Sequence, residues 1–369
     1  MGPAGGVFFR LTSSFRTRAA LGLRPVTAPV TVFLPLGIVL GPWGANFISL
    51  TALGHLDVVI SIVLATLGVF IGIAAGTQRG AVGRLLTAST VEAAVTILAV
   101  AGAVYALMHA WDMPSPIPYV LVALVLGLCA SASAAPSVDE GDNRARRVAA
   151  RVADLDDVLP IVVGGVVLAM IGEAGTPALA ALALSIGLGV AIAFSGWLLF
   201  ERTAGAERDV FVLGTLALLG GSAAYLEMSP LLAGLAGGWL WARAPGQTEQ
   251  VVATHLRKVQ HPLVVLLLIT AGASLQATTA GIWLFAPYLV FRTAGKLAGG
   301  WMASRLASEV APSDLGAYLI PPGVIGIAFA LNVLQVAPEA GGPIVFAVSA
   351  GAIVSELLAV IVTPGPNPV

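Results

Sequence analysis

The sequence predicts an all-helical protein that crosses a membrane many times, with about twelve transmembrane helices arranged as inverted repeats. Three observations predict this fold class. The 369 residues are 58% hydrophobic and only 10% charged, and their mean hydropathy is +0.95, a composition typical of polytopic membrane proteins. Twelve apolar segments follow one another along the chain, and the basic residues gather in every second connection between them.

Each apolar segment is predicted to form one membrane helix. A straight crossing needs about 20 residues, and several segments are shorter than this. The segments are 26–42, 57–75, 88–109, 117–135, 152–172, 177–200, 208–225, 229–242, 261–277, 280–303, 313–336 and 341–363. We expect residues 1–25 to form a basic cytoplasmic lead-in, 26–363 to form a single transmembrane unit, and 364–369 to form a short tail.

The basic residues predict the orientation. Of the 18 Lys and Arg residues, 16 lie before the first segment or in the connections after segments 2, 4, 6, 8 and 10. Because cytoplasmic loops carry the excess of Lys and Arg, both termini are predicted to be cytoplasmic, in a plasma (inner) membrane. The net charge of −1 gives no sign of nucleic-acid binding, and the single Cys129 matches no metal-binding spacing. We therefore expect no cofactor.

The segment 152–172 carries three carboxylates, Asp154, Asp156 and Asp157. An aspartate at mid-bilayer costs about 2.5–3.5 kcal/mol on insertion scales, so acids at this depth are functional candidates. Pro160 lies four residues after Asp156 and cannot donate to its carbonyl, which should be left free where the helix bends. Adjacent carboxylates and a free carbonyl would form a cation site with hard oxygen ligands, and the two acids would titrate as a coupled pair. Asp154 fits a hydrated position at the helix mouth instead.

Two other segments are predicted to be discontinuous. Segment 117–135 runs into the small, polar stretch Cys129–Ser137, and segment 313–336 contains Tyr318–Phe329, in which two prolines and two glycines should unwind the helix. Irregular backbone at membrane depth survives only where it is buried or lines a cavity. The two segments lie seven apart, which places them at matching positions of two five-helix repeats of opposite orientation. Paired broken helices in inverted halves point to the binding site of a secondary transporter.

The first and eighth segments, which are equivalent in these two repeats, also share a faint sequence pattern: LPLGIVLGP at 34–42 and SPLLAGLAGG at 229–238.

Four further charged residues lie well inside the apolar segments, away from the segment ends. Arg292 and Lys296 are four residues apart, so they share one face of their helix. A desolvated lysine can give up its proton and an arginine effectively cannot, which makes Lys296 the candidate for a switchable cation and Arg292 a fixed structural charge. Glu92 and Glu356 are the available partners for Arg292, and we expect both to be structural.

These pieces resemble the monovalent cation/proton antiporter superfamily, in the two-aspartate branch of the bacterial sodium/proton exchangers. The Asp-Asp pair on the fifth segment, combined with a lysine on the tenth, is the most specific element. The matching stretches are GIVLGPWG (37–44), LDDVLPI (155–161), SPLLAGLAGGWL (229–240), FRTAGKLAGGWMASRL (291–306) and PPGVIGIAFA (321–330).

The resemblance implies roles for individual residues. Asp157 would bind the ion, Asp156 would be its partner acid, and Lys296 would compensate charge by pairing with Asp156 when the cation is absent. Ser131 and Ser133 stand where relatives place a threonine or an acid, so they are possible ligands near the broken helices.

The resemblance also implies an architecture. Two crossed, broken helices would lie in a core of helices at about 57–172 and 280–363. Dimerisation or scaffold helices would lie at about 26–42 and 177–277, in a homodimer within the lipid bilayer. We expect this sequence to depart from many relatives by lacking an additional N-terminal helix ahead of the first segment, because residues 1–23 are too polar to form one.

The predicted function is secondary active antiport of a monovalent cation, Na⁺ before K⁺ or Li⁺, against H⁺ by alternating access, and not catalysis. Four alternatives stay open at this point. They are a potassium/proton antiporter of the same superfamily, an organic-anion/sodium symporter of related fold, a member that does not transport, and an intramembrane aspartyl protease. The protease is disfavoured because it needs two aspartates on different helices, whereas here the strong pair is adjacent on one helix.

Overall fold

The computed structural model describes residues 29–77, 82–136, 144–171, 177–203, 205–246, 248–306, 312 and 314–362. Helices make up nearly all of this part of the chain, and one isolated antiparallel bridge joins Ser133 to Pro322. The predicted lead-in at 1–25, the tail at 364–369 and the charged stretch 137–143 lie outside the described residues.

Every predicted apolar segment corresponds to one helix or to a pair of helices. The helices are α1 (Pro29–Leu40), α2 (Leu50–His55), α3 (Asp57–Thr77), α4 (Val82–Ala110), α5 (Tyr119–Ser131), α6 (Arg144–Asp156), α7 (Val158–Ile171), α8 (Ala178–Arg202), α9 (Gly205–Tyr225), α10 (Pro230–Arg243), α11 (Thr248–Ala273), α12 (Thr279–Leu306), α13 (Leu315–Tyr318), α14 (Val324–Val336) and α15 (Pro338–Val362). Segment 152–172 contains α7 and the end of α6, and segment 313–336 contains α13 and α14. The short α2 was not predicted.

The described helices suit a membrane. Five are long and apolar enough to cross one, by length and composition: Asp57–Thr77, Leu85–Ala110, Ala178–Arg202, Thr248–Ala273 and Pro338–Ala359. Shorter apolar helices accompany them at α1, α5 and α14. The chain is a multi-pass membrane protein, while the count of twelve crossings stays a prediction.

Two predicted helix starts are wrong by eight residues or more. The helix that carries the aspartates begins at Arg144 rather than near residue 152, and α11 begins at Thr248 rather than near 261. Both early turns are rich in charged residues, so hydropathy alone reads them as loops. Each nevertheless buries an apolar stripe, for example Val148 and Val152 in α6, and Val252 and Leu256 in α11, and this packing extends the helices.

Two glycine seams hold the two repeats together. A Cβ atom at Gly234 or Gly238 of α10 would overlap the carbonyl oxygens of α3, and α10 runs along α3. In the same way α1 runs along α11, where a Cβ at Gly37 would lie 2.9 Å from the Cα of Gly272. In an inverted repeat of segments 1–5 and 8–12, segment 1 corresponds to segment 8, and segment 2 corresponds to segment 9. The pair α1–α11 is therefore the repeat equivalent of the pair α10–α3. The weak match between 34–42 and 229–238 therefore marks equivalent packing surfaces.

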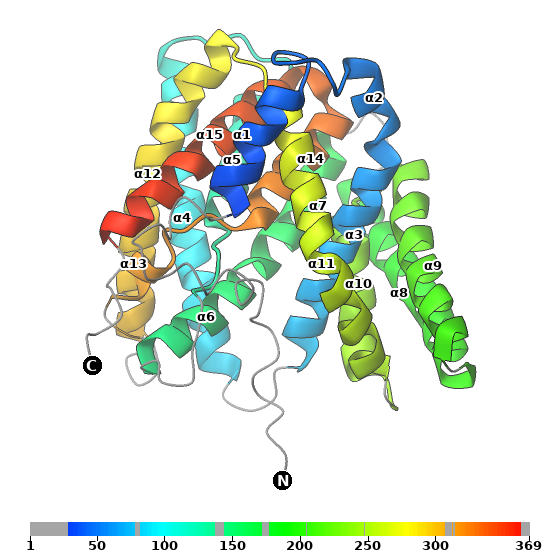
Figure 1. Cartoon of the computed structure of the whole chain (residues 1–369). Helices are drawn as coiled ribbons and strands as arrows, with labels where there is room; N and C mark the ends of the chain where they lie inside the picture. Colours follow the sequence, from blue (N-terminus) through cyan, green and yellow to red (C-terminus); the bar gives the residue numbers. More distant parts are fainter. Residues whose placement is uncertain are drawn as a thin grey trace, which may run out of the picture.

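The helices fall into two groups by packing. We call α4–α7 and α12–α15 the core group, and α1, α3 and α8–α11 the scaffold group, because the extensive helix contacts lie within each set. In Figure 1, α4 and α12 lie on the left and α8 and α9 on the right. The predicted division, with core helices at about 57–172 and scaffold helices at about 177–277, stays a prediction. In the structure α3 makes its most extensive contact with α10.

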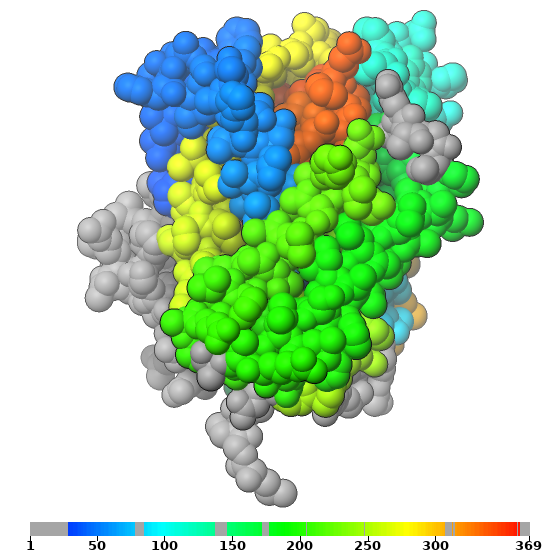
Figure 2. All heavy atoms as spheres, turned by 90° about the vertical axis from the view of Figure 1, so that its right-hand side faces the viewer, coloured from blue at the N-terminus to red at the C-terminus, as the bar shows by residue number. Residues whose placement is uncertain are grey.

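One face of the scaffold group is strongly apolar. Figure 2 views the molecule from this side, which the green α8 and α9 largely cover. Large side chains point outward along both helices, including Leu179 and Phe194 on α8 and Val210 and Leu218 on α9, which are 49–76% exposed. Such a surface suits contact with lipid.

Candidate functional site

The two broken helices cross at their unwound stretches. α5 ends at Ser131, and the chain continues as extended backbone; α13 ends at Tyr318, and α14 begins only at Val324. Besides the Ser133–Pro322 bridge, the Ala134 N–H donates to the Pro321 carbonyl at 2.9 Å, and the Gly323 N–H donates to the Ala132 carbonyl at 3.2 Å. The crossing that the resemblance implied is therefore present, at residues 132–134 and 319–323.

Arg292 ties this crossing together from α12. Its side chain is 1% exposed, and its guanidinium donates to the Ile320 carbonyl at 2.7 Å and to the Ala132 carbonyl at 3.1 Å. Glu92, which the sequence offered as an available partner for Arg292, contacts Lys296 instead. No hydrogen bond or ion pair links Arg292 to Glu356 within the described chain. The planar guanidinium can reach one carbonyl on each broken helix, which suits it to a structural role.

Lys296 lies one helical turn further along α12 and is fully buried. Its ammonium nitrogen is 3.1 Å from Glu92 Oε1 and 3.3 Å from Asp156 Oδ2. It also donates to the Ser133 hydroxyl at 2.6 Å and to the Ser131 carbonyl. The predicted contact with Asp156 is thus present, together with a second carboxylate that was expected to face Arg292.

The aspartates stand at a break between two helices. α6 ends at Asp156 and α7 begins at Val158, so Asp157 occupies the junction, three residues before Pro160. This is the discontinuity that the proline predicted. Asp156 is fully buried and Asp157 is 9% exposed, and one oxygen of each, Oδ1, has no hydrogen-bond partner. Asp154, one turn earlier, is half-buried.

The cluster formed by Glu92, Asp156, Asp157 and Lys296 has more acids than bases. Glu92, Asp156 and Asp157 would carry three negative charges against the one positive charge of Lys296, a difference of two. Buried negative charge needs compensation, and the unpartnered Oδ1 atoms of Asp156 and Asp157 are the acceptors left free to receive it.

The two serines differ in how they join the cluster. The Ser131 hydroxyl donates to the Leu128 carbonyl at 2.8 Å within its own helix, so only its carbonyl faces Lys296, whereas the Ser133 hydroxyl faces Lys296 directly.

Glycines on α12 bring Glu92 to the site. A Cβ at Gly299 would lie 2.8 Å from the Glu92 carbonyl oxygen, and one at Gly295 would lie 2.9 Å from the Cα of Thr96. α4 therefore packs directly on the lysine-bearing face of α12. The two glycines on either side of Lys296 are the sequence signal for this contact, although the predicted partner of Glu92 was Arg292.

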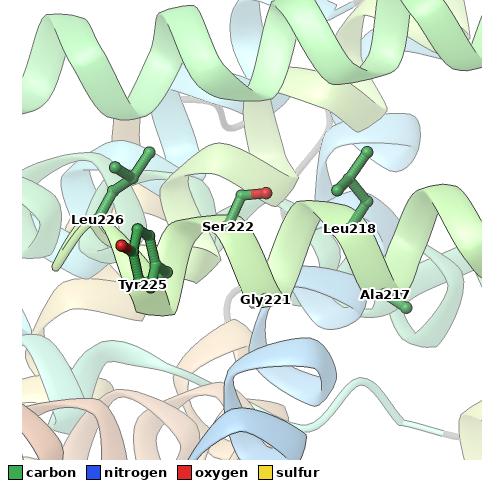
Figure 3. A pocket seen from close by; sticks show the side chains of 6 residues that line it. All are labelled: Ala217, Leu218, Gly221, Ser222, Tyr225 and Leu226. Carbon is green, nitrogen blue, oxygen red and sulfur yellow. The ribbon is translucent and has the colours of Figure 1, made fainter.

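Two other kinds of candidate site, a metal centre and a surface pocket, contain none of the predicted site residues. Among the described residues, no group of three or more His, Cys, Asp or Glu side chains is placed to hold a metal ion. A hollow of about 340 Å³ lies along α9 and is shown in Figure 3. It is lined by Ala217, Leu218, Gly221, Ser222, Tyr225 and Leu226. None of the predicted site residues lines it.

No protein-family model matches the sequence, and no curated protein matches it either. Among solved structures, the chain is similar to the sodium proton antiporter MjNhaP1 from Methanocaldococcus jannaschii. The superposition covers 94% of this chain and 96% of that one with a TM-score of 0.63, at 15% sequence identity. The chain therefore has the fold of a sodium/proton antiporter, as its sequence predicts.

Proposed function

We propose that the protein is a secondary active antiporter that exchanges a monovalent cation, Na⁺ before K⁺ or Li⁺, for protons. The observation that carries this proposal is the buried Asp156–Asp157 pair, whose free oxygens lie at a helix break beside the crossing of two unwound segments. In a fold shared with a sodium/proton antiporter, this is the place where unwound helices of transporters hold ions.

The two aspartates would bind either the cation or protons. Carboxylate oxygens are hard ligands that suit Na⁺, and the unwound segments offer backbone carbonyls nearby. The cation and the protons compensate the same negative charge. Binding of one therefore weakens binding of the other, which is the coupling that exchange requires. Lys296 would hold Asp156 when no cation is present.

Alternating access would come from movement between the two helix groups. We propose that the core group, which carries the site, moves against the scaffold group, and that α3 belongs to the scaffold because of its glycine seam with α10. The scaffold would form the contact in a homodimer. The distribution of Lys and Arg supports cytoplasmic termini in a plasma membrane.

The test is proton flux in proteoliposomes of the purified protein after addition of Na⁺, K⁺ or Li⁺. We expect the wild-type protein to move protons in response to at least one of these ions, and Asp156→Asn/Asp157→Asn protein to move none. The ion that gives the highest flux at the lowest concentration decides between sodium and potassium exchange. If no cation drives proton movement through folded wild-type protein, the proposal is wrong.

A further inference from the structure

The Lys296 ammonium has more acceptors than it can use. A lysine ammonium carries three N–H groups. Four groups surround this one: the Glu92 carboxylate, the Asp156 carboxylate, the Ser131 carbonyl and the Ser133 hydroxyl. One of the four is therefore surplus, and removing it would leave each N–H with a partner.

Asp156 is the partner that can best be released. Lys296 meets a single oxygen of Asp156, at 3.3 Å, but both oxygens of Glu92, at 3.1 and 3.3 Å. The Asp156 Oδ1 atom has no partner, and Asp157 at the helix break follows it directly in the chain. If Asp156 turned to a cation, Glu92, Ser131 and Ser133 would still give the ammonium three acceptors, one of them charged.

Glu92 is also firmly held. It is fully buried, and the Thr96 hydroxyl donates to its Oε1 atom at 3.0 Å from the next turn of α4. Its backbone packs closely on Gly299 of α12, where a Cβ atom would lie 2.8 Å from the Glu92 carbonyl oxygen. The Glu92 carboxylate thus has little freedom to leave the lysine.

We propose that Glu92 is a positioning residue that keeps Lys296 at the helix crossing and thereby frees Asp156 to exchange the lysine for the cation. This inference rests on the proposed function for its role in transport. It adds a second carboxylate to the lysine's surroundings, so an arriving cation that takes Asp156 does not leave the ammonium as an unpaired buried charge.

A double-mutant cycle tests the positioning without any transport. Glu92→Gln and Asp156→Asn each leave Lys296 one contacting carboxylate, while the double variant leaves none. We expect each single variant to unfold within a few degrees of wild type, and the double variant to lose clearly more than the two losses added together. Additive losses would show that the two acids do not share the lysine, and would overturn the proposal.

Cation-driven proton flux then separates positioning from a merely structural role. In Glu92→Gln, Asp156 becomes the only acid that contacts Lys296, so the cation must break that pair. We expect the KM for the cation to rise at least tenfold, with kcat changed less than threefold, in protein that folds normally. Glu92→Asp keeps the charge on a shorter side chain and should give a KM between wild type and Glu92→Gln. Glu207→Gln, on an exposed turn of α9, is the matched control and should behave as wild type.

These outcomes can be told apart from a failure of the proposed function. If wild-type protein moves no protons, the antiport proposal fails, while the stability cycle still decides whether Glu92 holds Lys296. If wild-type protein is active and folded Glu92→Gln has the same KM, the positioning role is wrong. It is equally wrong if Glu92→Asp has a KM as high as that of Glu92→Gln.

Discussion

Replacing Arg292 should loosen the crossing of the two broken helices. The guanidinium donates one hydrogen bond to Ile320 and one to Ala132, and a hydrogen bond involving a charged group contributes about 1.5–3 kcal/mol. Two such bonds give about 3–6 kcal/mol. The lower end applies because the Ala132 carbonyl keeps the Gly323 N–H, and because a buried charge is removed at the same time. We expect Arg292→Gln to destabilise the fold by about 3 kcal/mol.

Thermal unfolding of purified protein in detergent, followed by tryptophan fluorescence, measures this loss. A change of about 3 kcal/mol corresponds to a fall in Tm of roughly 4 °C for a chain of 369 residues, because the entropy of unfolding grows with chain length. Arg292→Lys should recover little of it, because an ammonium cannot present two parallel N–H groups to two carbonyls. The control is Arg305→Gln on the same helix, where the exposed guanidinium stacks over Trp301 at 5.2 Å. If Arg292→Gln unfolds at the wild-type temperature, or Arg292→Lys restores it fully, the bracing role is refuted.

Two further predictions concern packing and topology. Gly234→Ala should destabilise the protein by about 1–3 kcal/mol, because the new methyl group overlaps the Ala65 carbonyl. Gly102→Ala, where a Cβ meets nothing within 4 Å, should be neutral or slightly stabilising in the same unfolding assay; equal effects at both sites would contradict the seam. Cysteine tags at Asp112 and Gln250 should react with impermeant reagents from outside and from inside the cell, respectively. The native Cys129 is buried and gives a silent background, and a reversal of the two tags would overturn the predicted orientation.

Most of the helices were predictable, because a membrane helix shows in the sequence as a continuous stretch of apolar residues. The unwound stretches were predictable as well, since Pro321, Pro322 and Gly323 cannot continue a helix, and Pro160 marked the break at Asp157. The early turns of α6 and α11 were missed because their apolar stripes are narrow and interrupted by charged residues. In α6 the apolar residues, such as Val148 and Val152, recur at helical spacing, a signal that average hydropathy does not register.

The partners of the buried charges were less predictable. The sequence indicates that Arg292, Lys296 and Glu92 lie in the membrane, but their pairing depends on how helices far apart in the chain face each other. Arg292 binds backbone carbonyls, which have no sequence signature. Gly295 and Gly299 indicate that another helix approaches Lys296 closely, but they do not indicate that this helix carries Glu92.

The most direct test of the proposed ion site compares Asp157→Asn with Asp154→Asn, two identical changes on neighbouring turns. Asp157 lies at the helix break with a free buried oxygen, whereas Asp154 is half-buried one turn away. In proteoliposomes, Asp157→Asn should fold normally yet lose cation-driven proton flux and cation-dependent thermal stabilisation, while Asp154→Asn retains both. Normal flux through folded Asp157→Asn protein would contradict the assignment of the ion site.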